Sequence, residues 1–504
     1  MDFIEHIPLC TNMKATETTG SSLGTSGEEI AVFIGMNFAM SVLKMQRIRM
    51  YWQGMTRLPF TADAMPRDRF FKLRSALKFV DDNKISVAQR SLDRVWKVRP
   101  LLEEIRKRCN ELPREKKLSI DESIIPFRGR LNIKQHVPGK PNPDGLKMFV
   151  LASTKGLVYD FEIFQGKEAL ISLVDQLNAK PNRPVTLREA VVFRFLPSVE
   201  PGSSLFFDRY FTSPQLLGDL YDRCLRDTGT LKKNMLPKEA NLKSEATLKR
   251  EGRGASDSQV RYNRKVALTA WYDKKVIYMA SNEFGIKEED VCLRWSKARN
   301  EHIQVQRPCV VSEYNKAKGG VDLHDQVVSY YRSSSRTKKW TVRTRLHMMD
   351  VTTANGWLEY KADCGENKYM PYLDFKLQLA NQLTRGELSD RHGRLLGSTD
   401  SDEELGDPAP KTKTGKFKVP LPGEKERTTG AKHLPLIVSD DFRKCRKEGC
   451  KGKSRTVCSY CKVYLCCTST RNCFFDFILL KIPNIRKILF IMRYIIQAFF
   501  KFLI

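Results

Sequence analysis

The runs Leu118-Ser119-Ile120-Asp121-Glu122-Ser123 and Leu205-Phe206-Phe207-Asp208 each carry an aspartate where a short apolar, β-type stretch gives way to a turn or a helix. A third run, Gly319-Gly320-Val321-Asp322-Leu323-His324-Asp325, carries two aspartates three residues apart, which a helix would place on one face. Grouped carboxylates are the ligands that hold Mg²⁺ on phosphate groups. The three runs together predict a divalent-metal site at the edge of a sheet.

Each aspartate alone is a weak signal. An aspartate after a strand is often a turn residue or a helix cap, so a structural role is the ordinary explanation for any one of them. His324 lies between the two helical aspartates but faces elsewhere on a helix. We therefore expect His324 to be a surface residue rather than a catalytic base.

The charge balance favours a polyanionic partner. The 504 residues include 87 Lys and Arg against 58 Asp and Glu, a net charge of +29. A solvated basic surface would also explain this excess, but an acidic site inside a basic protein favours chemistry on nucleic acid. No apolar run is long enough for a membrane span and the start lacks a signal-peptide pattern, so we expect a cytosolic or nuclear protein without a membrane partner.

The apolar periodicity predicts a mixed α/β architecture with a covered sheet. Residues 28–111 follow the helical period, and Pro100 is expected to begin a new helix. From Lys117 onward, short β-type runs alternate with a helix candidate at Glu168–Leu177. The expected strands are Ser119–Ile120, Met148–Leu151, Val158–Phe164, Val191–Phe195 and Leu205–Phe207.

Further elements are expected towards the C-terminus. Thr212-Ser213-Pro214 predicts the start of a helix after Asp208, with leucines 216, 217 and 220 on its buried face. Val266–Trp271 and Val276–Met279 are expected to pair as a hairpin. Helical periodicity returns in Val321–Tyr331, Trp340–Tyr360 and Tyr372–Leu383, and the run 398–432 lacks apolar spacing and is expected to be disordered.

The cysteines near the C-terminus predict zinc binding. Seven of the thirteen cysteines crowd into one short segment, and Cys458 and Cys461 have the spacing of a zinc knuckle pair. Buried free thiols are a poor alternative because few apolar residues accompany them. The candidate Zn²⁺ ligands are Cys445, Cys450, Cys458, Cys461, Cys466, Cys467 and Cys473.

The residues around the aspartates carry a family resemblance. The runs Asp121 to Arg130, Phe207 to Leu217 and Tyr314 to Gln326 resemble the piggyBac-type transposases and the proteins derived from them. Matches such as Ser91 to Pro100 and Arg336 to Trp340 extend the resemblance over roughly residues 28–385, and the cysteine cluster adds to it.

The resemblance implies a chemistry. Asp121, Asp208 and Asp322 correspond to the family's catalytic aspartates in an RNase H-like domain, with Asp325 as a further acid of that site. They would hold Mg²⁺ or Mn²⁺ for cleavage and transfer of DNA strands at TTAA sites. The implied partner is double-stranded DNA, and the implied assembly is a homodimer in the nucleus.

The resemblance also implies a division into domains. A flexible N-terminus (1–27) would precede a helical dimerisation and DNA-binding domain in two parts (28–116 and 332–397), which flanks an RNase H-like domain in two parts (117–234 and 308–331) with an insertion domain (235–307). A disordered linker (398–440), a Cys-rich zinc domain (441–477) and an atypical apolar and basic tail (478–504) would follow.

The DNA-binding candidates are basic or aromatic. Trp340 follows two lysines and either stacks on an unpaired base or anchors the core of the next helix. The full set of candidates is Arg128, Arg130, Lys338, Lys339 and Trp340.

Two departures from the family pattern support a second hypothesis. Arg209 stands where the family commonly has Asn, and would either weaken metal binding by repulsion or contact a phosphate. Ile478 stands where a His usually closes the cysteine pattern, and the tail after it has the composition of a sticky or interfacial helix. The alternative is a domesticated, catalytically inactive, sequence-specific DNA- or chromatin-binding protein. A third hypothesis is a translated remnant without a stable core.

Overall fold

The computed structural model describes residues 3–385, apart from 180, 262, 288, 298, 334 and 366–368, and the stretches 435–438, 442–447, 449–459, 462–468 and 471–474. The chain divides into two compact units, the larger reaching Arg385 and the smaller holding the cysteine-rich strands. The expected disordered run 398–432 and the tail 478–504 lie outside the described residues.

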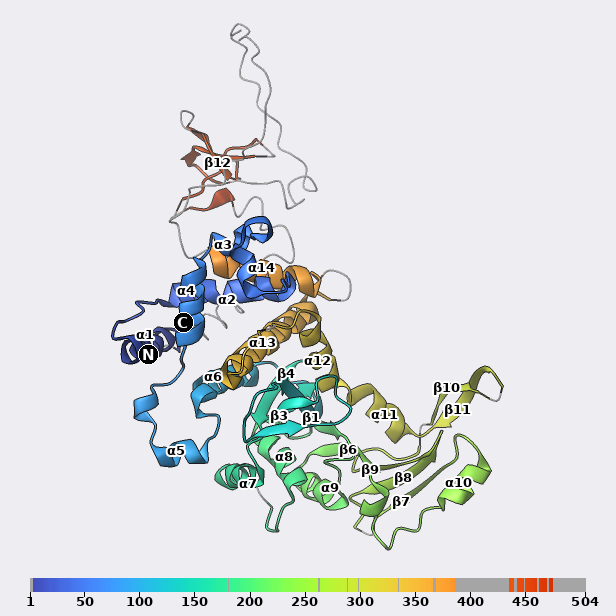
Figure 1. Ribbon diagram of the computed structural model, residues 1–504. Coiled ribbons are helices and arrows are strands. Elements are labelled where there is room, and N and C mark those ends of the chain that lie inside the picture. The colour runs from blue at the N-terminus through green and yellow to red at the C-terminus, as the bar shows by residue number, and fades with distance from the viewer. Residues whose placement is uncertain are drawn as a thin grey trace. The chain divides into compact units, whose positions relative to one another are not determined.

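A nine-stranded sheet forms the centre of the larger unit (Figure 1). Its strands follow the order β2-β3-β1-β5-β6-β9-β8-β7, and β4 also pairs with β3. The central strand β1 runs parallel to β5 and antiparallel to β3. The bounds are β1 Lys117–Pro126, β2 Lys134–His136, β3 Asp144–Ser153, β4 Val158–Ile163, β5 Ser204–Phe207, β6 Arg226–Leu231, β7 Ser256–Val260, β8 Ala267–Tyr272 and β9 Val276–Ser281.

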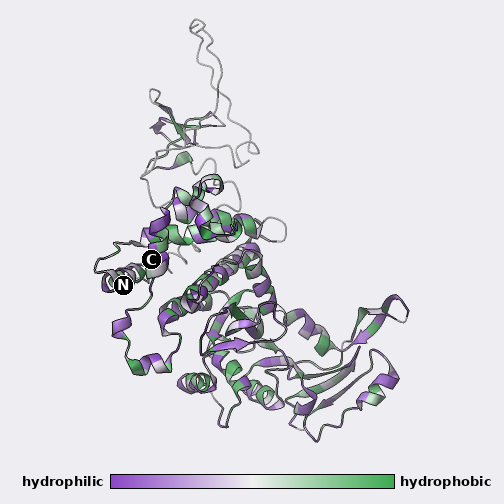
Figure 2. Cartoon of the chain, viewed as in Figure 1, coloured by the Kyte–Doolittle hydropathy of each residue, from purple (hydrophilic) through white to green (hydrophobic). Residues whose placement is uncertain are grey.

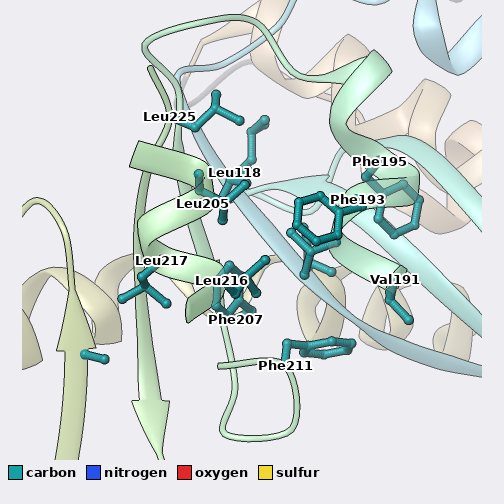
Figure 3. Close-up of a cluster of buried hydrophobic side chains, with 14 of the residues drawn as sticks. Leu118, Val191, Phe193, Phe195, Leu205, Phe207, Phe211, Leu216, Leu217 and Leu225 are labelled. Carbon is teal, nitrogen blue, oxygen red and sulfur yellow. The ribbon is translucent and has the colours of Figure 1, made fainter. Parts of the chain in front are cut away.

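Three helices, α7 (Lys167–Gln176), α8 (Leu187–Phe195) and α9 (Pro214–Tyr221), contribute to an extensive apolar core on one face of the sheet. Because side chains alternate along a strand, Leu118 and Ile120 point from β1 to this core. Figure 3 shows Leu205 and Phe207 beside side chains from α8 and α9. The leucines 216, 217 and 220 are buried, as the sequence predicted.

The prediction of a strand at Val191–Phe195 is wrong, because these residues belong to α8. Helix α8 begins with a capping box in which Glu189 N donates to Thr186 Oγ1 (3.4 Å) and Thr186 N donates to Glu189 Oε2 (2.9 Å). The helix is buried on all sides from Glu189 to Phe195, so it shows no alternation of polar and apolar residues. A buried helix and a buried strand have the same apolar pattern over such a short run.

The opposite face of the sheet packs against α11 (Cys309–Ala317) and α12 (Gly320–Tyr330). Phe206, the neighbour of Phe207, points to a second core that includes Val310 and Tyr314 of α11. The paired strands therefore send alternate side chains into two cores, and the candidate aspartates lie where this second face meets α12.

Helices from both ends of the larger unit pack together, with α2 against α14. Residues 1–27, expected to be flexible, instead contain helix α1, in which Ile7 and Cys10 are buried. The expected helices at 340–360 and 372–383 are present as α13 and α14. The bounds are α1 Phe3–Thr19, α2 Gly27–Val42, α3 Pro59–Ala62, α4 Arg67–Ala76, α5 Val87–Leu92, α6 Arg99–Asn110, α13 Trp340–Cys364 and α14 Tyr372–Arg385. Short 3₁₀ turns are η1 Ile48–Trp52, η2 Gly54–Thr56, η3 Asp82–Lys84, η4 Trp96–Val98, η5 Leu196–Ser198 and η6 Lys233–Met235.

The segment between β6 and α11 extends the main sheet. Strand β9 pairs with β6, and β8 and β9 form the expected hairpin, with Tyr272 opposite Val276. A separate two-stranded hairpin, β10 (Asp290–Ser296) and β11 (Glu301–Arg307), follows, and α10 (Glu245–Glu251) precedes β7.

The smaller unit contains four short strands, β12 Pro435–Ile437, β13 Arg443–Lys444, β14 Lys453–Ser454 and β15 Thr456–Cys458. Strand β12 pairs with β15 and β13 pairs with β14. Across the described part of the chain, no helix has the length and apolar character of a membrane span. Figure 2 shows hydrophilic residues distributed along the helices of the larger unit.

Candidate metal and nucleic-acid site

The pairing of β1 with β5 brings Asp121 and Asp208 to neighbouring positions. Ile120 lies opposite Phe207 in this parallel pair. Asp121 is the next residue within β1, and Asp208 is the residue directly after β5. The side chain of Asp121 points to the same face of the sheet as that of Ser119 and to the opposite face from that of Ile120, because side chains alternate along a strand. Both aspartates therefore lie on the face of the sheet opposite the core formed with α7, α8 and α9, on the side that α11 and α12 cover.

Helix α12 brings the other two aspartates to the same side. A Cβ atom on Gly320 would lie 2.0 Å from the carbonyl oxygen of Ser153. The helix can therefore approach β3 this closely because residue 320 has no side chain. The hydroxyl of Ser123 donates to Asp325 Oδ1 at 2.7 Å. This bond ties Asp325 to β1, one turn of helix along from Asp322.

Lys140 lies among these carboxylates and was not among the predicted site residues. It comes from the turn between β2 and β3, and its Nζ lies 3.3 Å from Asp322 Oδ1. Burial alone would lower the pKa of Lys140, but the charges of Asp121, Asp322, Asp325 and Glu122 raise it. The only local sequence signal was the Gly139-Lys140-Pro141 turn, which predicts a loop but not its destination.

The carboxylates are short of positive charge. The pKa of Asp121 is raised to about 7, mainly by burial and also by the charges of Glu122 and Asp208, which together outweigh the lowering effect of Lys140. Burial likewise raises the pKa of Asp325, although the Ser123 hydrogen bond and Lys140 lower it. A bound cation would stabilise the ionised forms of both groups.

The donor set suits Mg²⁺ or Mn²⁺, which take carboxylate oxygens. The side chain of Asp322 is 68% exposed, whereas Asp121 and Asp208 are half-buried, each accepting a backbone N–H at 2.7 Å. In the described part of the chain, one group of three or more His, Cys, Asp or Glu residues has its ligand atoms within 4.8 Å of one another, and all its members are cysteines. The carboxylate oxygens of the four aspartates therefore do not form such a cluster.

His324 is a correction to the sequence prediction. It is 3% exposed, and its Nδ1 lies 2.9 Å from the carbonyl oxygen of Gly156, so it is not a surface residue. Burial lowers the pKa of His324 to about 4, so the imidazole is neutral at physiological pH. Its role is to dock α12 on the turn after β3.

The DNA-binding candidates lie on two basic surfaces of the larger unit. Arg128 and Arg130 are exposed just after the C-terminal end of β1. Burial lowers the pKa of Arg343, and the nearby charges of Arg332 and Arg128 lower it further. Arg209 is also exposed.

Lys338, Lys339 and Trp340 line a groove of about 1140 Å³. Trp340 is half-buried there, while both lysines are exposed. Further basic residues of the groove are Lys14, Arg69, Lys72, Arg74, Lys78, Lys97 and Arg345.

Four of the predicted zinc ligands converge in the smaller unit. The Sγ atoms of Cys445, Cys450, Cys466 and Cys473 all lie within 4.8 Å of one another. Cys450 Sγ is 3.9 Å from Cys466 Sγ and 3.5 Å from Cys473 Sγ, close to the roughly 3.8 Å expected between ligands of a tetrahedral zinc ion.

The surroundings favour a thiolate at Cys450, whereas burial is the main cause that raises the pKa of Cys466 to about 11 and of Cys473 to about 12. The N–H of Gly452 and the thiol of Cys473 lower the pKa of Cys450 to about 7. Cys458 and Cys467 are not members of this quartet, and Cys461 lies outside the described residues. The predicted knuckle pair of Cys458 and Cys461 therefore stays a prediction.

Comparisons with known proteins agree on one family. A family model described as "Transposase IS4" matches residues 1–357. The human PiggyBac transposable element-derived protein 3 is 30% identical over 382 residues, covering 74% of this chain and 61% of the relative. The human PiggyBac transposable element-derived protein 2 is 29% identical over 368 residues, covering 71% of this chain and 59% of the relative. The chain thus spans about three fifths of the length of these relatives.

A solved structure supports the fold. The cryo-EM structure of a piggyBac transposase synaptic complex with hairpin DNA superposes with a TM-score of 0.61 and 24% sequence identity. The match covers 76% of this chain and 77% of that one.

Proposed function

The chain belongs to the piggyBac-type members of this transposase family, and from that premise we propose that it is a metal-dependent DNA transposase or a close derivative of one. The reaction would be cleavage and transfer of DNA strands at TTAA sites. The observation that supports this best is the placement of Asp121 within β1 beside Asp208, which directly follows the paired strand β5, with Asp322 and Asp325 on the helix that packs against β1.

The proposed site is the centre of an RNase H-like domain. Parallel β1, β5 and β6, with antiparallel β3 and β4 at one side, support that assignment. Asp121, Asp208 and Asp322 would hold divalent ions, and Asp325, bonded to Ser123, would add charge and fix α12. When bound, these ions would supply the positive charge that attacking and leaving phosphate oxygens need.

The remaining residues would bind and orient the DNA. Arg128 and Arg130 follow the C-terminal end of β1, the strand that carries Asp121, so they would bind the DNA backbone near the reacting phosphate. Lys338 and Lys339 would bind backbone phosphates further from the aspartates. The half-buried Trp340, which lines the same groove, would stack on a base. We also propose a nuclear location and a homodimer, because the reaction takes place on chromosomal DNA and joins two transposon ends.

The Cys-rich unit would hold zinc. The quartet of Cys445, Cys450, Cys466 and Cys473 has the ligand number and the sulfur spacing of a structural site. It accounts for one ion, and we propose that this ion stabilises a small DNA-recognition unit.

The test is a cleavage assay. Purified protein with Mg²⁺ is incubated with duplexes that carry the terminal repeats of piggyBac-type elements next to TTAA. Wild type is expected to nick them and Asp208→Ala to lose the activity, while Asp222→Ala, which removes an exposed acid paired with Lys265, should retain it. Unchanged cleavage in Asp208→Ala would contradict the proposal.

One observation favours the second hypothesis, an inactive DNA-binding protein. Arg209 places an exposed cation directly after Asp208, where it opposes a metal ion. DNA binding that weakens steeply with salt, without nicking by wild type or by Arg209→Asn, would support this hypothesis. Nicking by Arg209→Asn alone would show that the site is intact apart from that residue.

A further inference from the structure

A buried arginine of α13 has no acidic partner. Arg345 is 2% exposed, and its Nε makes no hydrogen bond. Its guanidinium lies 5.7 Å from the ring centre of Phe33, and no carboxylate of the described residues forms an ion pair with it. A charge buried in this way is unfavourable unless an anion pairs with it.

A second arginine lies close by. Arg74 of α4 donates to the hydroxyl of Ser335 and to the carbonyl oxygen of Arg336 (3.5 Å). Burial lowers the pKa of Arg345 to about 9, and the charge of Arg74 adds to that effect. Burial also lowers the pKa of Arg74. The two side chains thus form a positive pair that the protein itself does not neutralise.

The acids of this region are committed to other cations. Glu29 accepts two bonds of 2.6 Å from Arg69. Asp350, on the same helix as Arg345, accepts from Lys376 (2.8 Å) and twice from Ser333. Asp68 pairs with Arg67 at 2.9 Å and is the only acid among the described residues that line the two hollows beside Arg345.

Two hollows are lined by this pair. Arg74 and Arg345 line both the groove of about 1140 Å³ and a second hollow of about 400 Å³. The second hollow adds four more cations, Lys44, Arg47, Arg49 and Arg336. An anion can therefore reach the two guanidinium groups from solvent, and it would meet a positive surface on the way.

We propose that Arg74 and Arg345 form an oxyanion site that takes a phosphate group. Guanidinium groups bind tetrahedral oxyanions through paired N–H donors, and a phosphate would neutralise the buried charge and occupy Nε of Arg345. The phosphate comes either from a nucleic-acid backbone or from a free phosphate compound. The backbone source rests on the proposed DNA binding, whereas the free source does not.

The first measurement is thermal unfolding of the full chain in pyrophosphate or in sodium chloride of equal ionic strength. Wild type should gain several degrees in a saturable manner with pyrophosphate. Arg345→Met, which keeps the side-chain length without the charge, should be at least as stable as wild type in chloride and should lose the gain. Arg74→Met should weaken the gain, and Lys297→Met, at an exposed position outside both hollows, should keep it.

The second measurement identifies the source through the salt dependence of affinity for a mixed-sequence duplex. If the backbone fills the site, Arg345→Met should lower the slope of log affinity against log salt by about one, as expected for one lost phosphate contact. An unchanged slope with a pyrophosphate gain assigns a free phosphate compound. The proposal is overturned if pyrophosphate does not stabilise wild type and Arg345→Met leaves the salt slope unchanged. It is also overturned if Arg345→Met keeps both the pyrophosphate gain and the wild-type slope. Because neither measurement involves cleavage, failure here is separate from failure of the Asp208→Ala test.

Discussion

The ammonium of Lys140 lies 3.3 Å from Asp322 Oδ1, inside the set of carboxylates proposed to hold metal ions. The lysine side chain is 21% exposed and the aspartate side chain 68% exposed, so the pair lies at the mouth of the site. Asp121 and Asp325 act on the same ammonium group. Lys140 is thus a cation of the protein that occupies part of the space where a divalent ion is expected.

The first prediction follows from this competition. Lys140→Met should lower the dissociation constant for Mn²⁺ about tenfold, because a metal ion would no longer displace an ammonium group. In EDTA the same variant should unfold at a lower temperature than wild type, because the carboxylates lose a neutralising charge. Calorimetric titration with Mn²⁺ measures the first effect and thermal unfolding the second. Lys155→Met serves as a control, and weaker Mn²⁺ binding by Lys140→Met would contradict the competition.

The second prediction concerns the contact between α12 and β3. Gly320→Ala places a methyl group 2.0 Å from the Ser153 carbonyl oxygen, so the helix must shift. Overpacking of this kind should cost about 1–3 kcal/mol in the free energy of unfolding. The shift would also move Asp322 and reduce cleavage or metal affinity. Gly319→Ala is the matched control, since its methyl group meets nothing within 4 Å. Equal urea unfolding curves for the two variants would refute this account.

The third prediction concerns the cysteine quartet. Cys450→Ser removes one of four converging Sγ atoms and should release the zinc that wild type retains, measured as zinc per chain by mass spectrometry. Cys467→Ser, at an exposed cysteine outside the quartet, should keep its zinc. The smaller unit should become sensitive to protease in Cys450→Ser and in EDTA-treated wild type. Retention of zinc by Cys450→Ser would show that other ligands hold the ion.

Most elements were predictable because their apolar residues recur at a clear period. The helix after Thr212 and the β8–β9 hairpin were predicted from caps, turns and alternation. The same reasoning failed at Val191–Phe195, which is buried on all sides and therefore has no period to read. It also missed α1, whose apolar residues are too few to stand out.

The candidate site was predictable only in part, for a similar reason. The aspartates end apolar runs and so signal their position locally. Lys140 and the docking of His324 depend on contacts across more than 150 residues of sequence, such as the 168-residue separation of His324 from Gly156. Likewise, the sequence spacing alone did not single out Cys445, Cys450, Cys466 and Cys473 as the sulfur atoms that converge in space. Local pattern thus identifies residue types, and the tertiary fold decides which of them meet.

The last prediction is a pH dependence that originates in α13. His347 is buried, neither ring nitrogen has a hydrogen-bond partner, and burial, with Arg332, His324 and Arg343, lowers its pKa to about 3. The unfolded chain, with a histidine pKa near 6.5, binds more protons than the folded one between these values. The stabilisation is therefore complete above pH 6.5 and is lost as the pH falls towards 3, by at most about 5 kcal/mol. His347→Met should flatten this acid limb in urea unfolding, whereas His302→Gln, at an exposed position, should leave it unchanged. If the free energy of unfolding of His347→Met falls as steeply at low pH as that of wild type, other groups cause the loss.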